Sequence, residues 1–347
     1  MRSCRVARVG EGRRHSPLHN PRQTRYANAA LPAAHFPNVP AWCLDKYPGA
    51  WWYYRFEGCR INYITITARI VQTGVEVFRG TVAISDYMFT NEAVPNWAFD
   101  WSLQLVSVQL GNPLGLSISN ARVQCVGMGS NDWPCGVSSG GDGIPSQPLV
   151  PNVAARGVWY MTSPDELSTP GIIMNHFVQA RVQFNYAYPN TPPLDWPDIG
   201  QRIRCDNALP GYALSGCTFP YRPYLAYSQA TFPELTAHIA SAQAAGAPGS
   251  DTLPPKVPLN RLTNTALADK NRNTACPPAV PRPPGKSCDE YPFRSTWQGH
   301  YTRRGGYPVS ARMIDQDENS LGGTDLGTFY RENRVIENDA FWVWITP

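Results

Sequence analysis

Apolar and polar residues alternate along much of the chain up to about residue 200. The clearest run is INYITITARIVQTGVEVFRGTVAISDYMFT (61–90), which alternates on both sides of Thr73-Gly74, a dipeptide typical of a hairpin turn. Similar runs follow at 101–110, 117–128 and 172–188. About six to eight such strands, separated by Gly, Pro and Asn, predict an antiparallel β-sandwich-like domain. His176, inside the last run, is expected to be an ordinary strand residue and not a ligand.

The pattern changes after residue 200. Residues 231–246 predict a helix with Pro233 in its first turn, and 259–276 predict a second, weakly apolar helix. APGSDTLPPKVP (247–258) between them has the composition of a linker. The expected organisation is a disordered basic tail (1–38), a β-rich disulfide-stapled domain (39–200), a connecting region with one helix and a Pro/Gly linker (201–258), and a C-terminal domain (259–347).

The last sixty residues predict a strand, a turn, a second strand, a polar loop and a helix. In KSCDEYPFRSTWQGH (286–300) the acids Asp289 and Glu290 precede Tyr291-Pro292, and a residue before proline is held extended. A second strand is expected to end at Ile314, and a polar loop follows it. Thr324 is expected to cap the helix, whose apolar face is Leu326, Phe329 and Tyr330. AFWVWITP (340–347) predicts a final strand.

Two adjacent acids on an extended segment predict separate chemical roles. Neighbouring side chains of a strand point to opposite faces, so Asp289 and Glu290 are not expected to share a proton. Glu318 and Asn319, in the loop before the helix, add hard oxygen ligands that suit Mg²⁺, Mn²⁺ or Ca²⁺ better than zinc. One such cation can neutralise a scissile phosphate while a base activates water. The alternative is an exposed acidic turn with no chemistry.

Composition agrees with a β-rich chain and leaves the partner open. The 347 residues include 34 Pro and 28 Gly, and charged residues are 16%, below the roughly 25% of ordinary soluble domains. The net charge of +4 permits a polyanionic partner without requiring one. No stretch is apolar enough to predict a membrane span.

The nine cysteines predict local disulfides. Eight form sequential pairs separated by 10 to 16 residues: Cys43 and Cys59, Cys125 and Cys135, Cys205 and Cys217, Cys276 and Cys288. None has the spacing of a zinc knuckle, and each staple would contribute about 3 kcal/mol. The pattern favours an oxidising, extracellular destination over eight reduced thiols, and the connectivity itself cannot be deduced from the sequence. Cys4 is left over, and the N-terminus shows no apolar run of a signal peptide.

The C-terminal motifs also carry a resemblance. CDEYPFRSTWQG, followed by RMIDQDENSLGGTDLGTFYRENRV and an aromatic last strand, resembles the NucA/NucB family of secreted bacterial deoxyribonucleases. More narrowly, it is similar to the actinobacterial type that has a long β-rich region before the nuclease. The specific similarity covers about residues 270–345. It implies a small ββα-metal nuclease domain, and hence an α+β chain overall.

The resemblance also implies roles for individual residues. Asp289 matches the position at which this family has an acidic general base, and Glu290 is expected to support it. Asn319 matches the metal-ligand Asn, with Glu318 as its companion and Mg²⁺ or Mn²⁺ as the metal. A Cys276–Cys288 disulfide would hold the first active-site strand.

Basic residues in the same segment are candidates for substrate binding. Arg294, Arg312 and Arg331 belong to a dense group of arginines that could follow a phosphate backbone. His300 stands where the family pattern has a small residue. A surface position, a substrate contact and a conventional base are all open for it.

The leading hypothesis is therefore a secreted, monomeric, metal-dependent, non-specific endonuclease that hydrolyses phosphodiester bonds of DNA, with RNA as an open alternative. A second hypothesis is a non-catalytic carbohydrate-binding or adhesion protein, because aromatic clusters such as WWYYRF (51–56) can stack on sugars, although core packing is the commoner role. A third is a toxin of interbacterial competition with an immunity or inhibitor protein as partner. A fragment from about Pro258 to Pro347 is expected to retain nuclease activity.

Overall fold

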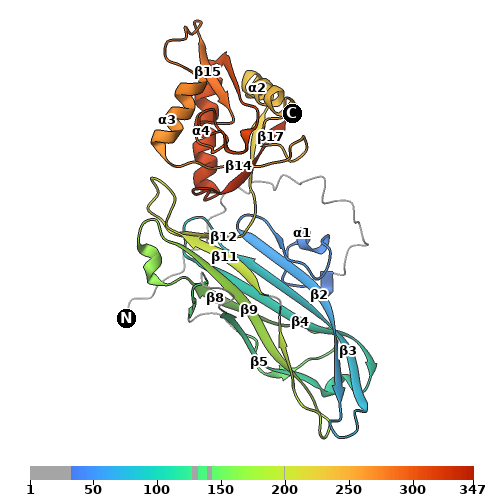
Figure 1. Ribbon diagram of the computed structural model, residues 1–347. Helices are drawn as coiled ribbons and strands as arrows, with labels where there is room; N and C mark the ends of the chain where they lie inside the picture. The colour runs from blue at the N-terminus through green and yellow to red at the C-terminus, as the bar shows by residue number, and fades with distance from the viewer. Residues whose placement is uncertain (1–32, 127–131, 139–142, 199) are drawn as a thin grey trace.

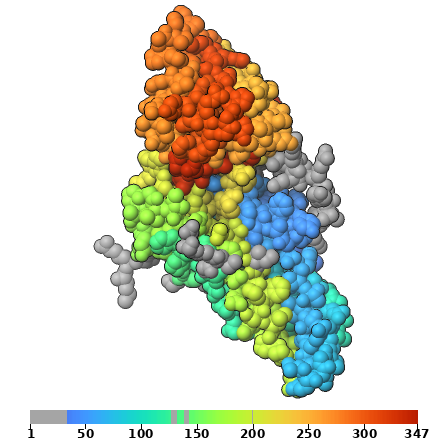
Figure 2. Space-filling view, in the orientation of Figure 1, coloured from blue at the N-terminus to red at the C-terminus, as the bar shows by residue number. Residues whose placement is uncertain are grey.

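The computed structural model describes residues 33–126, 132–138, 143–198 and 200–347. The chain forms an elongated β-sandwich with a compact α+β part at one end (Figure 1). In the space-filling view the α+β part, coloured yellow to red, sits directly on the end of the sandwich (Figure 2). The structure is thus a mixed α+β chain, as the sequence predicts.

The first sheet of the sandwich is built from the long hairpins that the alternation predicts. Its strand order is β1-β2-β3-β4-β8-β6, and neighbouring strands in this order are antiparallel. The strands are β1 (Trp52–Tyr53), β2 (Glu57–Arg69), β3 (Glu76–Phe89), β4 (Asn96–Leu110), β6 (Gly136–Ser138) and β8 (Ala155–Thr162). The turn between β2 and β3 contains Thr73-Gly74, where Gly74 has a positive φ of 70° that suits glycine.

The second sheet packs face to face on the first. Its order is β12-β11-β9-β5-β7, with β10 also paired to β9. The strands are β5 (Leu116–Cys125), β7 (Gln147–Pro148), β9 (Ile173–Tyr186), β10 (Leu194–Pro197), β11 (Gln201–Asp206) and β12 (Gly216–Thr218). Buried and less buried positions alternate along β9 from Ile173 to Asn185, so one of its faces enters the core, which Phe184 shares with Phe99 and Trp101 of the first sheet.

Two of the expected boundaries differ from the structure. Residues 201–218, assigned by sequence to the connecting region, form β11 and β12 of the second sheet. Residues 33–38, assigned to the disordered tail, are ordered, because Phe36 is buried and the Asn38 amide donates to the Asp100 carbonyl at 2.9 Å. Residues 1–32, including Cys4, lie outside the described part of the chain.

The short helices of the sandwich are α1 (Ala41–Leu44) and the 3-10 turns Ala33–His35, Pro113–Gly115 and Asp165–Ser168.

The α+β part has a small mixed sheet, a two-stranded hairpin and three helices. β13 pairs in parallel with β17, β17 pairs with β14, and β15 pairs with β16. The elements are β13 (Tyr224–Ser228), α2 (Pro233–Ala244), β14 (Leu259–Asn260), α3 (Thr265–Ala275), β15 (Lys286–Tyr291), a 3-10 turn (Arg304–Gly306), β16 (Ser310–Asp315), α4 (Gln316–Glu332) and β17 (Ala340–Thr346). Helix α2 thus belongs to the core of this part, to which it contributes Leu235 and Ile239. Among the described helices none is long and apolar enough to cross a membrane.

Helix α4 begins eight residues before the cap predicted from sequence. The Asp315 carboxylate accepts hydrogen bonds from the backbone N–H groups of Asp317 and Glu318, which makes Asp315 the N-cap in place of Thr324. The prediction of a polar loop at this point is therefore wrong. Glu318 and Asn319 lie in the first turn of the helix, directly after strand β16.

The four predicted disulfides are present. They join Cys43 to Cys59, Cys125 to Cys135, Cys205 to Cys217 and Cys276 to Cys288. Cys205 and Cys217 are cross-strand partners of β11 and β12. Cys276, at the end of α3, fastens that helix to Cys288 on β15, next to Asp289.

A buried ionic cluster joins the two parts of the chain. Arg334 lies two residues after the end of α4 and is fully buried. Its guanidinium donates to the Asp206 carboxylate of β11 at 2.6 Å. Arg204 bonds both Asp206, at 3.0 Å, and Asp339, at 2.6 Å. Arg55 lies in the turn between β1 and β2 of the first sheet, and its guanidinium is 3.0 Å from the Asp339 carboxylate. We call these five residues the interdomain cluster; they fix the α+β part against the sandwich.

Candidate active site

A cavity of about 340 Å³ opens between α4 and the segment formed by the end of β15 and the residues that follow it. Asp289, Glu290 and Asn319 all line it, so the structure brings together three of the four residues to which the sequence assigns catalytic or metal-binding roles. The other lining residues are Tyr227, Leu235, Phe293, Arg294, Ser295, Gly322, Gly323, Leu326, Gly327 and Tyr330. Gly322 lets α4 approach Leu235 closely, because a Cβ there would lie 2.4 Å from Leu235 Cδ2.

Asp289 is held by a histidine that the sequence analysis did not single out. Its Oδ2 lies 2.6 Å from Nδ1 of His238, and the other ring nitrogen of His238, Nε2, lies 2.9 Å from the Ser310 hydroxyl. Asp289 is only 6% exposed and His238 is fully buried. The three side chains come from β15, α2 and β16 and form one hydrogen-bonded chain.

The geometry gives His238 and Asp289 different access to the cavity. Asp289 lines the cavity, whereas His238 is completely buried behind it and does not. Since Oδ2 of Asp289 is bonded to the imidazole, Oδ1 is the oxygen that can accept a proton from water. His238 can orient the carboxylate, but it cannot reach a substrate itself.

Glu290 has different neighbours from Asp289, as expected for adjacent residues of a strand. Burial, together with the Asp289 carboxylate, raises the pKa of Glu290 to about 7, against the opposing effect of Arg294 and Arg272. Two carboxyl groups therefore meet at one cavity without full compensation by protein cations. Such an arrangement favours the binding of a positive ion at the cavity.

Asn319 is fixed in the first turn of α4 by two hydrogen bonds. Its amide nitrogen donates to the Ser287 hydroxyl at 2.8 Å and to the Cys288 carbonyl at 3.2 Å, both on β15. These bonds use the nitrogen, so the amide oxygen is the atom that can ligate a cation. The same bonds tie α4 to the strand that carries Asp289.

Glu318 occupies a different position from the one its expected role requires. It does not line the cavity; its Oε2 accepts hydrogen bonds from the backbone N–H groups of Glu234 and Leu235, at 2.8 and 3.0 Å. Phe232, the N-cap of α2, has no side chain that can accept a hydrogen bond. Glu318, which belongs to α4, caps the N-terminus of α2 instead. In return Glu234 accepts from the Asp315 N–H at 2.7 Å. These contacts give Glu318 a structural role at the start of α2.

The candidate substrate-binding residues are not gathered in one place. Arg294 lines the cavity and bonds Asp269 at 3.0 Å. Arg312 is exposed on β16, in register with Asp289. Arg331 is exposed near the far end of α4, about 18 Å along the helix from Asn319. His300 is half-buried and its Nε2 lies 3.0 Å from the Ser310 carbonyl, outside the lining of the cavity.

The donor atoms at the cavity fit a hard divalent cation. Among the described residues no group of three or more His, Cys, Asp or Glu side chains is close enough to hold a metal. Two carboxylates and one amide oxygen remain, which matches the way Mg²⁺ is held by one or two carboxylates while it keeps several waters. Asp289, Glu290 and Asn319 are therefore the residues that would hold or approach such an ion.

His238 could have been found from its position on the predicted helix. It lies among apolar residues, between Leu235 and Ile239, and both of these are buried. A polar ring on the buried face of a helix needs a hydrogen-bond partner, which marks it as part of a network. The identity of that partner, 51 residues away, is not visible in the pattern.

A strand–strand–helix unit with acids and an amide at one cavity has the features of a small hydrolytic nuclease domain. The comparison with protein families agrees: residues 254–344 match the family described as Deoxyribonuclease NucA/NucB. This match confirms the resemblance of the region to the NucA/NucB family that the sequence shows. No curated protein matches the chain. The matched residues begin after α2, so His238 lies outside them.

Proposed function

We propose that the protein is a secreted, divalent-metal-dependent endonuclease that cuts DNA without sequence specificity. The observation that carries the proposal is the position of Asp289, at the cavity of a NucA/NucB-type domain and bonded to a buried histidine. The four disulfides support an oxidising destination outside the cell.

Asp289 acts as the general base in the proposed reaction. Its Oδ1 takes a proton from a water molecule while the water oxygen attacks the scissile phosphorus. The bond to the 3′ oxygen breaks, and that oxygen is protonated from solvent, which leaves a 3′-hydroxyl and a 5′-phosphate. His238 donates its Nδ1–H to Oδ2 and holds the carboxylate at the angle needed for this transfer.

Glu290 and Asn319 complete the proposed site. A bound Mg²⁺ or Mn²⁺ would supply positive charge for the phosphate and the leaving oxygen. The Glu290 carboxylate and the Asn319 amide oxygen are its proposed ligands, and Asn319 is kept in place by its two bonds to β15. Arg294, at the edge of the cavity, is the proposed contact to the phosphate backbone.

Nicking of supercoiled plasmid tests the proposal directly. The wild-type protein should convert plasmid to open-circular and linear forms with Mg²⁺ or Mn²⁺, and EDTA should stop the reaction. Asp289→Asn, which keeps the shape and removes the proton acceptor, should lower the rate by about 10²–10⁴-fold.

His300→Ala is the matched control, because His300 lies outside the cavity lining. Its loss should cost far less than the loss of Asp289. A nearly normal rate for Asp289→Asn together with an inactive His300→Ala would show that the base has been assigned to the wrong residue.

A further inference from the structure

A second cavity, of about 620 Å³, lies where the sandwich meets the α+β part. Six aromatic side chains line it: Tyr54, Phe56, Tyr87, Phe89, Tyr221 and Tyr224. Its volume is in the usual range for sites that bind small molecules. It includes Tyr54 and Phe56 of the WWYYRF cluster, whereas Tyr53 of the same cluster stacks on Phe219 and packs against the sandwich core. We call this cavity the aromatic groove.

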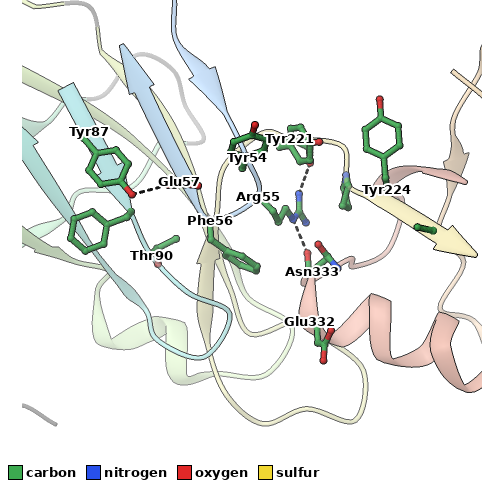
Figure 3. A pocket seen from close by; sticks show the side chains of 13 residues that line it. Tyr54, Arg55, Phe56, Glu57, Tyr87, Thr90, Tyr221, Tyr224, Glu332 and Asn333 are labelled. Atoms are coloured by element: carbon green, nitrogen blue, oxygen red, sulfur yellow. Dashed lines mark hydrogen bonds between the residues drawn. The ribbon is translucent and has the colours of Figure 1, made fainter. Parts of the chain in front are cut away.

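Besides tyrosine hydroxyls and the Arg55 guanidinium, the lining of the aromatic groove includes four polar side chains, two of them carboxylates. Glu57 and Glu332 bring carboxylates, and Asn333 and Thr90 bring an amide and a hydroxyl. Tyr87 donates to Glu57 at 2.7 Å, and the two residues form one side of the groove (Figure 3). Glu332 and Asn333 stand at the carboxyl end of α4, where the helix dipole adds partial negative charge. The groove is thus acidic as well as aromatic.

Arg55 is the one basic residue among those that line the groove, and its guanidinium already donates hydrogen bonds to other groups of the protein. Figure 3 shows Arg55 in the middle of the groove, with bonds to Asn333 and Tyr221. Arg55 also bonds the Arg334 carbonyl at 2.9 Å and the Asp339 carboxylate at 3.0 Å. A phosphate would therefore meet two carboxylates and no available cation, so charge disfavours nucleic acid here.

The groove is also separate from the nuclease site. Asn319 lies in the first turn of α4 and Glu332 is its last residue, so about 20 Å of helix separates them. A ligand bound in the groove would not touch Asp289 or Glu290.

We propose that the aromatic groove binds an oligosaccharide of neutral hexose or amino-sugar units. The C–H face of a hexose ring is apolar and stacks on an aromatic ring, and its hydroxyls donate to carboxylate and amide oxygens at the rim. The amines of an amino sugar would in addition be attracted by Glu57 and Glu332. This is a binding function independent of the nuclease reaction, and it would hold the enzyme on a glycan-covered surface.

Calorimetric titration of the full-length protein with cellohexaose and with a chitosan hexamer tests the inference. At least one of the two should bind, and Phe89→Ala should weaken that binding by about fivefold or more, as the loss of a stacked aromatic ring at a binding site does. Phe89 is 40% exposed at the end of β3, so its removal should leave the fold intact. Tyr224→Ala is a second variant from the opposite side of the groove, and the melting temperature of each variant reports its folding.

Tyr188→Ala is the matched control, because Tyr188 is 47% exposed and does not line the groove. Tyr188→Ala should bind the sugar as the wild type does, and plasmid nicking should be unchanged in Phe89→Ala and in Tyr188→Ala. Absence of binding by both sugars at about 10 mM, or binding that folded Phe89→Ala and Tyr224→Ala leave unchanged, would refute the inference. Binding of an oligothymidylate or of choline that the groove variants abolish, without sugar binding, would also refute it and identify another occupant.

Discussion

Asp289 and His238 are 51 positions apart in the chain and 2.6 Å apart in the structure. A carboxylate that is bonded on one side by an imidazole keeps one oxygen in a fixed direction, and a general base depends on that direction. Ser310 bonds the other nitrogen of the ring and so prevents it from rotating. At the scale of residues, the proposed base is Asp289 together with His238 and Ser310, which fix its orientation.

His238 should therefore affect the chemical step more than substrate binding. His238→Ala is expected to lower kcat by about 10- to 100-fold with little change in KM, as removal of a residue that orients a functional group does. His238→Asn places an amide N–H near the position of Nδ1–H and should recover part of the loss. Steady-state kinetics on duplex DNA measure both constants. A fall of both variants to the same level, with a changed KM, would instead indicate a general structural role.

Substitution of Asn319 and substitution of Glu318 should have different effects on the metal concentration that activity requires. Asn319→Ala removes a proposed ligand, so its activity should need more Mn²⁺ and should recover at high Mn²⁺ concentration. Glu318→Ala removes the cap of α2, so it should lower the free energy of unfolding by about 0.5–2 kcal/mol and leave the Mn²⁺ requirement unchanged. Metal titrations and urea denaturation separate the two effects. A raised Mn²⁺ requirement in Glu318→Ala would restore Glu318 as a metal ligand.

At the scale of elements, α2 and β13 border the candidate active site, through Leu235 and Tyr227, although they precede the matched family region. Helix α2 supplies His238, and its N-terminus is tied to that of α4 by Glu318 and Glu234. Strand β13 pairs in parallel with β17 through five residue pairs, from Tyr224–Trp342 to Ser228–Thr346. A domain boundary after α2 would cut through this sheet and remove the partner of Asp289.

The sequence predicts that a fragment of residues 258–347 is active, and the structure gives the opposite expectation. This fragment lacks α2 and β13, so it should be inactive and poorly folded. A fragment of residues 222–347 retains both elements and should cut plasmid measurably. Plasmid nicking and circular dichroism of the two fragments provide the comparison. Equal activity of the shorter fragment would mean that His238 is dispensable.

At the scale of the whole molecule, the interdomain cluster makes the two parts one unit. Arg334 is fully buried, and its guanidinium also donates to the Glu92 carbonyl at 2.6 Å and the Leu214 carbonyl at 3.0 Å. A buried charge of this kind is tolerated only because its partners are in place. The sandwich thereby fixes the loop between α4 and β17, and it contributes Tyr54 and Phe56 to the aromatic groove.

Asp206→Asn should show how much the cluster contributes. It leaves the Arg334 guanidinium buried without its carboxylate, so the free energy of unfolding should fall by about 3–5 kcal/mol. Asp195→Asn is the matched control, because the Asp195–Arg181 pair is partly exposed, and it should change stability by about 1 kcal/mol or less. Urea denaturation measures both. Equal, small losses would show that the cluster does not hold the two parts together.

The sequence alone determined the features that depend on local pattern. Alternation over 61–90 and 172–188 predicted β2, β3 and β9, and cysteine spacing predicted disulfides that close short loops, because a strand face and a short loop are both local properties. The motifs around Asp289 and Asn319 pointed to the nuclease family and to two residues that share one cavity.

Only the tertiary structure decided which distant groups meet. The start of α4 at Gln316 depends on the Asp315 cap, and the position of Glu318 depends on the unsatisfied N–H groups of another helix. The His238–Asp289 pair, the burial of Arg334 and the aromatic groove all join segments separated by tens to hundreds of residues. Hydrogen bonds and ion pairs of this kind are chosen by packing in three dimensions, because a buried polar group takes whichever partner the fold brings to it, and the order of residues along the chain does not record that choice.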